Sequence, residues 1–134
     1  MEQKLRLLIV DDDIDLATSL KAMIGARYKQ LIVDIASGGL EAMRMIRNGG
    51  INAVLTDVAM PDMDGCELYS KISTFNPEIQ VIMMSAYYDA KHTIVRSKLL
   101  GLKDIVPSLE LIEKRELIEK VFSKIEKHFL KKDE

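Results

Sequence analysis

Acidic side chains follow two apolar stretches of this sequence directly, and a serine ends a third stretch. The candidate reactive or ligand-binding residues are Asp11, Asp12, Asp13, Asp57 and Ser85. If the stretches are neighbouring strands, the carboxylates share one pocket, where two of them about 4 Å apart repel by roughly 4 kcal/mol at an effective dielectric of about 20. Such a pocket needs a proton or a cation, and oxygen ligands with space for water suit Mg²⁺.

A carboxylate held beside a cation could also react with a phosphate donor. It would act as the nucleophile and become an aspartyl phosphate, while the cation offsets the charge of the transferred group. Ser85 would offer its hydroxyl to a phosphate oxygen. The simpler interpretation is that Asp11, Asp12 and Asp13 only cap a helix and that Asp57 begins a turn. The presence of these residues at three adjacent strand ends favours the functional interpretation.

The elements that must position these residues are predicted from the apolar pattern. Largely unbroken apolar runs indicate strands buried on both faces, and they cover residues 7–10, 31–36, 53–56, 79–84 and 104–106. Amphipathic stretches indicate helices, and they cover residues 14–28, 39–47, 66–75, 90–100 and 110–130. Alternation of strand and helix predicts an α/β fold, with a doubly wound parallel sheet and helices on both faces.

Three details of the helices follow from the same pattern. Ser37 is expected to cap the helix over residues 39–47. Met23 is expected on the inward face of the first helix, and Phe75 on the inward face of the third.

Length and composition limit the classes of protein to which this chain can belong. A chain of 134 residues suits one domain, so residues 1–134 are expected to form a single domain. Its 19 basic and 21 acidic residues give a net charge of −2, which argues against direct nucleic-acid binding. One cysteine excludes an internal disulfide and a cysteine-cluster zinc site. The apolar run at residues 7–10 is too short for a signal peptide or membrane span, so we expect a cytoplasmic protein without membrane association.

The acidic segments resemble those of the receiver domain of two-component response regulators. The most specific segment is residues 57–65, where an aspartate after an apolar strand precedes Met-Pro-x-Met-Asp-Gly, and the segments at residues 7–13, 39–42, 81–86 and 101–104 support it. The resemblance covers essentially the whole chain. It implies a flavodoxin-like fold, a three-layer sandwich whose five parallel strands have the order 2-1-3-4-5.

The resemblance also implies a role for each matching residue. Asp57 would be the phosphoacceptor. Asp12 and Asp57 would ligate Mg²⁺ directly, Asp11 would act through water, and Ala59 would contribute its backbone carbonyl. Ser85 would be the switch hydroxyl that turns toward the phosphoryl group.

Two further expectations come from the family. Pro61 and Gly65 would shape the loop after Asp57, with Gly65 adopting a positive φ. The phosphate donor would be a sensor histidine kinase or a phosphotransfer protein, and the downstream partner an output protein or domain. The domain would catalyse its own phosphorylation and slow dephosphorylation without turning over a separate substrate.

The chain departs from the family after the fifth predicted strand, where members carry a lysine and, three positions earlier, an aromatic residue. Aligned without gaps from residue 101, the lysine position holds Ser108 and the aromatic position holds Ile105. Aligned instead on Pro107, the lysine position holds Val106. Lys103 is the nearest substitute, and we expect it to face solvent. Without that cation the carboxylates should hold their protons more tightly, and phosphorylation should depend more on Mg²⁺. Phosphorylation should also be coupled less tightly to the output face, the surface that binds the output partner.

Two other functions remain open. The missing lysine is typical of a pseudo-receiver, an interaction module that phosphorylation does not control. A haloacid-dehalogenase-like phosphatase would use Asp11 as nucleophile, with Asp13 and Ser85 completing its first two motifs. However, the chain leaves no room for a cap domain and has no later acidic motif to bind that family's metal.

Overall fold

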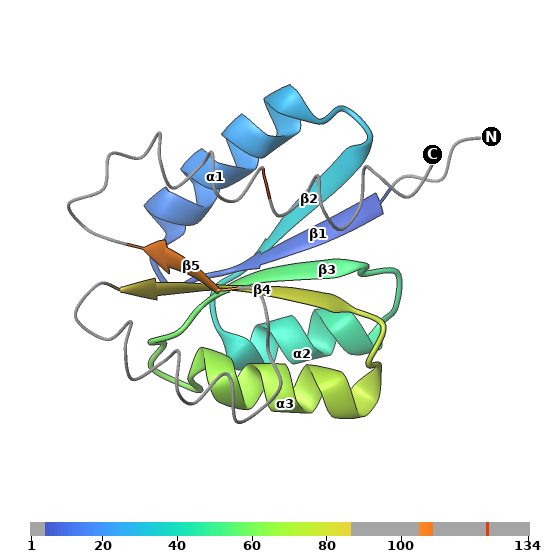
Figure 1. Cartoon of the computed structure of the whole chain (residues 1–134), viewed down its shortest axis with the longest axis vertical. Helices are drawn as coiled ribbons and strands as arrows, with labels where there is room; N and C mark the ends of the chain where they lie inside the picture. Colours follow the sequence, from blue (N-terminus) through green and yellow to red (C-terminus); the bar gives the residue numbers. More distant parts are fainter. Residues whose placement is uncertain (1–4, 87–104, 109–122, 124–134) are drawn as a thin grey trace.

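A five-stranded parallel sheet forms the centre of the molecule (Figure 1). The computed structural model describes residues 5–86, 105–108 and 123. The strands are β1 (Leu5–Val10), β2 (Leu31–Ala36), β3 (Ala53–Asp57), β4 (Gln80–Ala86) and β5 (Ile105–Ser108). Their order is β2-β1-β3-β4-β5 and every neighbouring pair is parallel, so the predicted doubly wound topology is confirmed.

Helices cover both faces of this sheet. They are α1 (Ile14–Arg27), α2 (Gly39–Arg47) and α3 (Gly65–Phe75). Helix α1 lies on one face, and α2 and α3 lie side by side on the other (Figure 1). The helices predicted over residues 90–100 and 110–130 lie outside the described residues. No helix in the described part is long and apolar enough to span a membrane.

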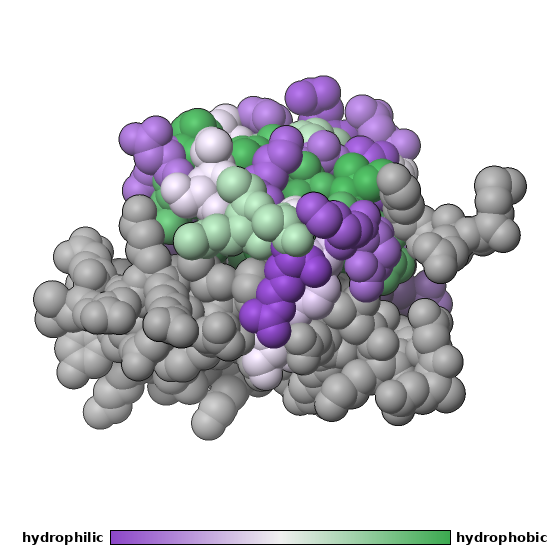
Figure 2. All heavy atoms as spheres, turned by 90° about the horizontal axis from the view of Figure 1, so that it is seen from above, coloured by the Kyte–Doolittle hydropathy of each residue, from purple (hydrophilic) through white to green (hydrophobic). Residues whose placement is uncertain are grey.

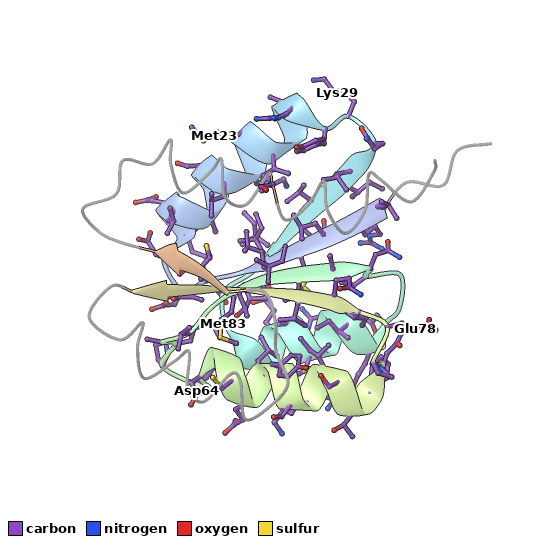
Figure 3. All side chains as sticks on the ribbon, viewed as in Figure 1. Met23, Lys29, Asp64, Glu78 and Met83 are labelled. Carbon is purple, nitrogen blue, oxygen red and sulfur yellow. The ribbon has the colours of Figure 1, made fainter. Side chains whose placement is uncertain are left out.

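The strands are unbroken apolar runs because both of their faces are buried. In β1, Leu7 and Ile9 pack in the cluster that contains α1 residues, whereas Leu8 and Val10 pack in the cluster that contains α2 and α3 residues. All four side chains are at most 1% exposed. Burying each one fully contributes roughly 1.5–3 kcal/mol relative to leaving it in water. Met83 of β4 belongs to the α2 and α3 side (Figure 3).

Two predicted core residues lie at the surface instead. Met23 is 42% exposed and points away from the sheet (Figure 3). Its helix buries a stripe centred on Leu20 and Ile24, and a step of about 100° per residue puts Met23 at the margin of that stripe. Phe75 is 49% exposed, at the last residue of α3 before Asn76 ends the helix. Seen from above, the described surface mixes hydrophilic and hydrophobic side chains (Figure 2).

Acidic residues cap two of the three helices that the structure describes. Asp13 Oδ1 accepts a hydrogen bond from the Leu16 N–H at 3.1 Å and caps α1. Asp64 caps α3 in the same way. The predicted Ser37 cap of α2 is wrong, because Gly38 is the cap residue and the Ser37 hydroxyl donates to the Glu41 carboxylate instead, at 2.8 Å.

Candidate functional site

Strand register brings the ends of β1 and β3 to the same level. Val10, the last residue of β1, pairs with Ala36 of β2 on one side and with Thr56 of β3 on the other. Asp11 follows Val10, and Asp57 follows Thr56 as the last residue of β3. The Asp11 N–H donates to the Ala36 carbonyl at 3.1 Å, which holds the chain in line as it leaves β1. The two aspartates therefore lie side by side at the carboxyl edge of the sheet, where ligands of this architecture bind.

Three of the predicted carboxylates meet at this edge. One ligand oxygen each from Asp11, Asp12 and Asp57 lies within 4.8 Å of the other two. Asp13 stands apart from this cluster because its side chain caps α1. The capping interpretation is therefore right for Asp13, while the carboxylates of the other three lie together as predicted.

Burial gives this pocket unusual acid–base properties. Asp11 is 2% exposed, and loss of hydration raises its pKa from 3.8 to about 7, despite the hydrogen bond that it accepts from the Asp13 N–H at 2.9 Å. Burial also raises the pKa of Asp57 above its ordinary value, and the negative charge of Asp12 adds to the rise. Hydrogen bonds from the Val58 and Ala59 amides to Asp57 act in the opposite direction. The surroundings therefore solvate the negative charge of these carboxylates poorly.

A tight loop fixes the Asp57 carboxylate after β3. The Val58 N–H lies 2.8 Å from Asp57 Oδ1 and 3.1 Å from the Met84 carbonyl of β4, so both share this donor. The Gly65 N–H donates to the Val58 carbonyl at 2.7 Å, which closes the loop where α3 begins. The buried Thr56 hydroxyl donates to the Asp57 carbonyl at 2.9 Å. Backbone and carboxylate of Asp57 are therefore both held.

Gly65 is required by this closure, but not for the predicted reason. Among the described residues, positive φ occurs only at Gly49 and Gly50, so the expectation for Gly65 is wrong. A Cβ atom at Gly65 would lie 2.5 Å from the Asp57 carbonyl oxygen and 3.0 Å from the Val58 Cα. Backbone passes too close at this point for any side chain.

The donor chemistry of the pocket fits Mg²⁺. All three side-chain donors are carboxylate oxygens, which hard divalent cations prefer, and Asp12 and Asp57 are accessible while Asp11 is buried. Three carboxylates this close repel unless protons or a cation compensate them. Ala59, whose carbonyl the resemblance adds to this set, is exposed two residues after Asp57.

Strand β4 lies beside β3, which ends in Asp57, and β5 lies on the other side of β4. Met84 pairs with Asp57, and Ser85 follows Met84 in β4. In β5, Ile105 pairs with Met83, and Ser108 is the last residue and pairs with Ala86. The side chains of Ser85, Ile105 and Ser108, and the whole of Lys103, lie outside the described part of the chain.

One polar contact near the pocket was not predicted from the sequence. The Asp62 carboxylate accepts hydrogen bonds from the Gly39 and Leu40 amides at the start of α2, at 3.2 and 2.9 Å. These bonds hold the pKa of Asp62 below its ordinary value. No local sequence signal reveals them, because the partners lie 22 and 23 residues away.

Fold and site together define a doubly wound α/β domain. A cluster of three carboxylates that suits a divalent cation lies at the carboxyl edge of its sheet. Comparison with known proteins supplies the family: the chain belongs to the response regulator receiver domain family, whose model matches residues 7–122. It is thus a receiver domain of the kind found in two-component response regulators.

Individual relatives agree with this assignment. The chain is 41% identical over 86 residues to the transcriptional regulatory protein ZraR of Klebsiella oxytoca, covering 63% of this chain and 19% of that protein. It is 31% identical over 118 residues to ZraR of Escherichia coli K12, covering 87% of this chain and 26% of the relative. The chain therefore spans about a fifth to a quarter of the length of these relatives.

A solved structure agrees over most of its length. The CheY-like response regulator receiver domain protein from Methanospirillum hungatei JF-1 is 30% identical, with a TM-score of 0.75, covering 93% of this chain and 96% of the other.

Proposed function

We propose that residues 1–134 form one receiver domain that works as a phosphorylation-dependent switch of a two-component phosphorelay, with Asp57 as the phosphoacceptor. The observation that carries the proposal is the convergence of Asp11, Asp12 and Asp57 within 4.8 Å in a member of this family. The Asp57 carboxylate is held by the Val58 amide, and its backbone is held by the strand and the loop.

The reaction assigned to Asp57 is phosphoryl transfer to a carboxylate. An Asp57 oxygen forms a bond to phosphorus while the bond from phosphorus to the donor breaks, and the leaving group keeps that bond's electron pair. The Val58 N–H holds Oδ1 and so fixes the direction in which the carboxylate faces. Hydrolysis by water then returns Asp57 to its starting state, so no separate substrate is turned over.

Mg²⁺ is the cofactor that this pocket would hold, through Asp12, Asp57 and the Ala59 carbonyl, with Asp11 acting through water. When bound, it offsets negative charge on the carboxylates and on the incoming phosphate. Burial raises the pKa of Asp11 to about 7 and so favours its protonated form. Asp11 would have to give up this proton when the cation binds. Ser85 would donate its hydroxyl to a phosphate oxygen.

The absence of a lysine from β5 distinguishes this domain from family members that carry one. The strand reads Ile-Val-Pro-Ser, with Ile105 at the aromatic position and Ser108 at the lysine position. A charge-assisted contact contributes roughly 1.5–3 kcal/mol, out of about 5.5 kcal/mol needed to move a switch from 1:99 to 99:1. Phosphorylation should therefore shift the output face less completely than in members that carry the lysine.

The partners follow from the same role. A sensor histidine kinase or a phosphotransfer protein would donate the phosphoryl group in the cytoplasm, and an output protein or domain would respond. The net charge of −2 gives no support to direct contact with nucleic acid.

Intact-mass measurement after incubation with acetyl phosphate tests the proposal. Wild type with Mg²⁺ should gain one phosphoryl group, whereas Asp57→Asn or removal of Mg²⁺ should abolish the gain. Asp64→Asn is the matched control, because Asp64 lies in the same loop, caps α3 and takes no part in the cluster. Labelling that survives in Asp57→Asn would contradict the assignment of the phosphoacceptor.

A pseudo-receiver is the second candidate, and the observation that favours it is the lysine-free β5. This candidate predicts no labelling of wild type at any Mg²⁺ concentration, together with partner binding that Asp57→Asn leaves unchanged. The phosphatase alternative loses its basis, since Asp13 caps α1 and the family assignment supports a receiver domain.

A further inference from the structure

We propose that Asp62 is a positioning residue for phosphorylation, which fastens the loop after Asp57 to the start of α2. We call this contact the Asp62 latch; it comprises the Asp62 carboxylate and the amides of Gly39 and Leu40. The proposal rests on the proposed function. It adds a route from the phosphoacceptor loop to α2 that does not need the missing lysine.

The loop after Asp57 is anchored at its base and at its outer part. Residues 58–64 leave β3 and return to α3, and the Gly65 amide closes the loop at its base. At the outer part of the loop, the latch supplies two hydrogen bonds of 3.2 and 2.9 Å to another element. Asp62 is exposed, so water could hydrate its carboxylate. The two hydrogen bonds are therefore not needed to compensate a buried charge. The latch thus restrains the segment that carries Ala59, whose carbonyl is assigned to the ion.

The start of α2 has free amides that suit a carboxylate partner. Gly38, the cap residue of α2, has no side chain to bond the free amides there, and Ser37 points its hydroxyl to Glu41. The first amides of a helix carry partial positive charge, so a carboxylate is the favoured partner. Asp62 takes this place from the neighbouring loop. The pairing stabilises the charged form of the carboxylate and so lowers the pKa of Asp62.

The loop after Asp57 and the start of α2 approach each other closely. A Cβ at Gly38 would lie 2.9 Å from both Asp62 carboxylate oxygens, and one at Gly39 would lie 2.7 Å from Met63 Sδ. Gly38 has φ −177°, an extended conformation that any residue adopts, so the absence of a side chain there serves the approach of Asp62. Met63 is 7% exposed and packs in the same core cluster as α2.

The test compares labelling by acetyl phosphate among latch variants, well below their melting temperatures. Asp62→Ala should slow labelling by about tenfold and raise the Mg²⁺ concentration for half-maximal rate, since a displacement of about 1 Å can cost up to a hundredfold. Asp62→Asn keeps one acceptor oxygen and should recover part of the rate. Glu78→Ala is the matched control, as an exposed acidic residue at the opposite edge of the sheet (Figure 3), and should label like wild type.

A double-mutant cycle separates positioning from simple loss of stability. Gly38→Ala should slow labelling in wild type by displacing the Asp62 carboxylate, yet should have no further effect in Asp62→Ala, where nothing is displaced. In both single variants the Leu40 amide should exchange its hydrogen faster. A role in stability alone would instead lower the melting temperatures and leave labelling rates of the folded variants unchanged.

The outcomes distinguish this inference from the proposed function. If wild type is labelled at Asp57 and Asp62→Ala is labelled equally fast, the latch proposal is overturned and the proposed function stands. If wild type is not labelled at all, the proposed function fails and the latch proposal falls with it. Slowed labelling in Asp62→Ala, partial recovery in Asp62→Asn and non-additive effects of Gly38→Ala support the latch.

Discussion

The affinity of the acidic pocket for Mg²⁺ should depend steeply on pH, and Asp11 sets the size of the effect. Its pKa is raised from 3.8 to about 7 by burial. With that pKa, about 0.9 of the molecules carry a proton on Asp11 at about pH 6, and about 0.1 at about pH 8. Binding the cation requires this proton to leave. Apparent affinity should therefore be about tenfold weaker at the lower pH, or about 1.4 kcal/mol.

Isothermal titration calorimetry measures this effect directly. Titrations with Mg²⁺ in buffers of different ionisation enthalpy should report release of about one proton at about pH 6 and about none at about pH 8. The Asp57 pKa is raised as well, so its titration can only steepen the dependence. Asp11→Asn should bind more weakly at the higher pH and lose most of the pH dependence. Equal wild-type affinities at the two pH values, or an unchanged dependence in Asp11→Asn, would refute the reasoning.

The other predictions concern stability and the division of roles among the aspartates. Without metal, the folded state holds the Asp11 proton up to about pH 7, whereas the unfolded state holds it only to about pH 4. The free energy of unfolding, measured with urea, should therefore decrease as pH rises from about 4 to about 7. Asp11→Asn should make this decrease smaller. Gly65→Ala should lower the free energy of unfolding by about 1–3 kcal/mol, whereas Gly25→Ala, with open space around its Cβ, should raise it by about 0.5–1 kcal/mol. Asp13→Ala should cost about 1 kcal/mol by removing the α1 cap but leave Asp57 labelling intact, and loss of labelling would count against the assigned roles.

Much of the fold could be predicted because its signals are local. Unbroken apolar runs indicate strands buried on both faces, and Leu7 to Val10 alternate between the two core clusters as that interpretation requires. Strand bounds differ by one or two residues at some ends: β1 begins at Leu5 and β5 ends at Ser108, beyond the predicted residues. The acidic cluster was also predictable, since parallel strands bring Asp11 and Asp57 to one edge.

Features that depend on distant partners could not be predicted. Ser37 has the residue type and position of a helix cap, yet the amides that it would serve are taken by Asp62 from another loop. Gly65 suggests a special backbone angle, whereas its real constraint is the Asp57 carbonyl 2.5 Å from where a Cβ would be. Met23 fits a helical period but lies at the margin of the buried stripe. In each case the deciding contact comes from tertiary structure.

The position of a bound divalent ion would show whether Asp11, Asp12 and Asp57 act together as one metal site. Crystals soaked in Mn²⁺, which takes the same oxygen ligands as Mg²⁺ and scatters anomalously, would locate it. We expect one strong peak among the carboxylates of Asp11, Asp12 and Asp57, lost in crystals of Asp57→Asn. A peak at another place in the domain, or one that persists unchanged without the Asp57 carboxylate, would show that these aspartates are not the metal site.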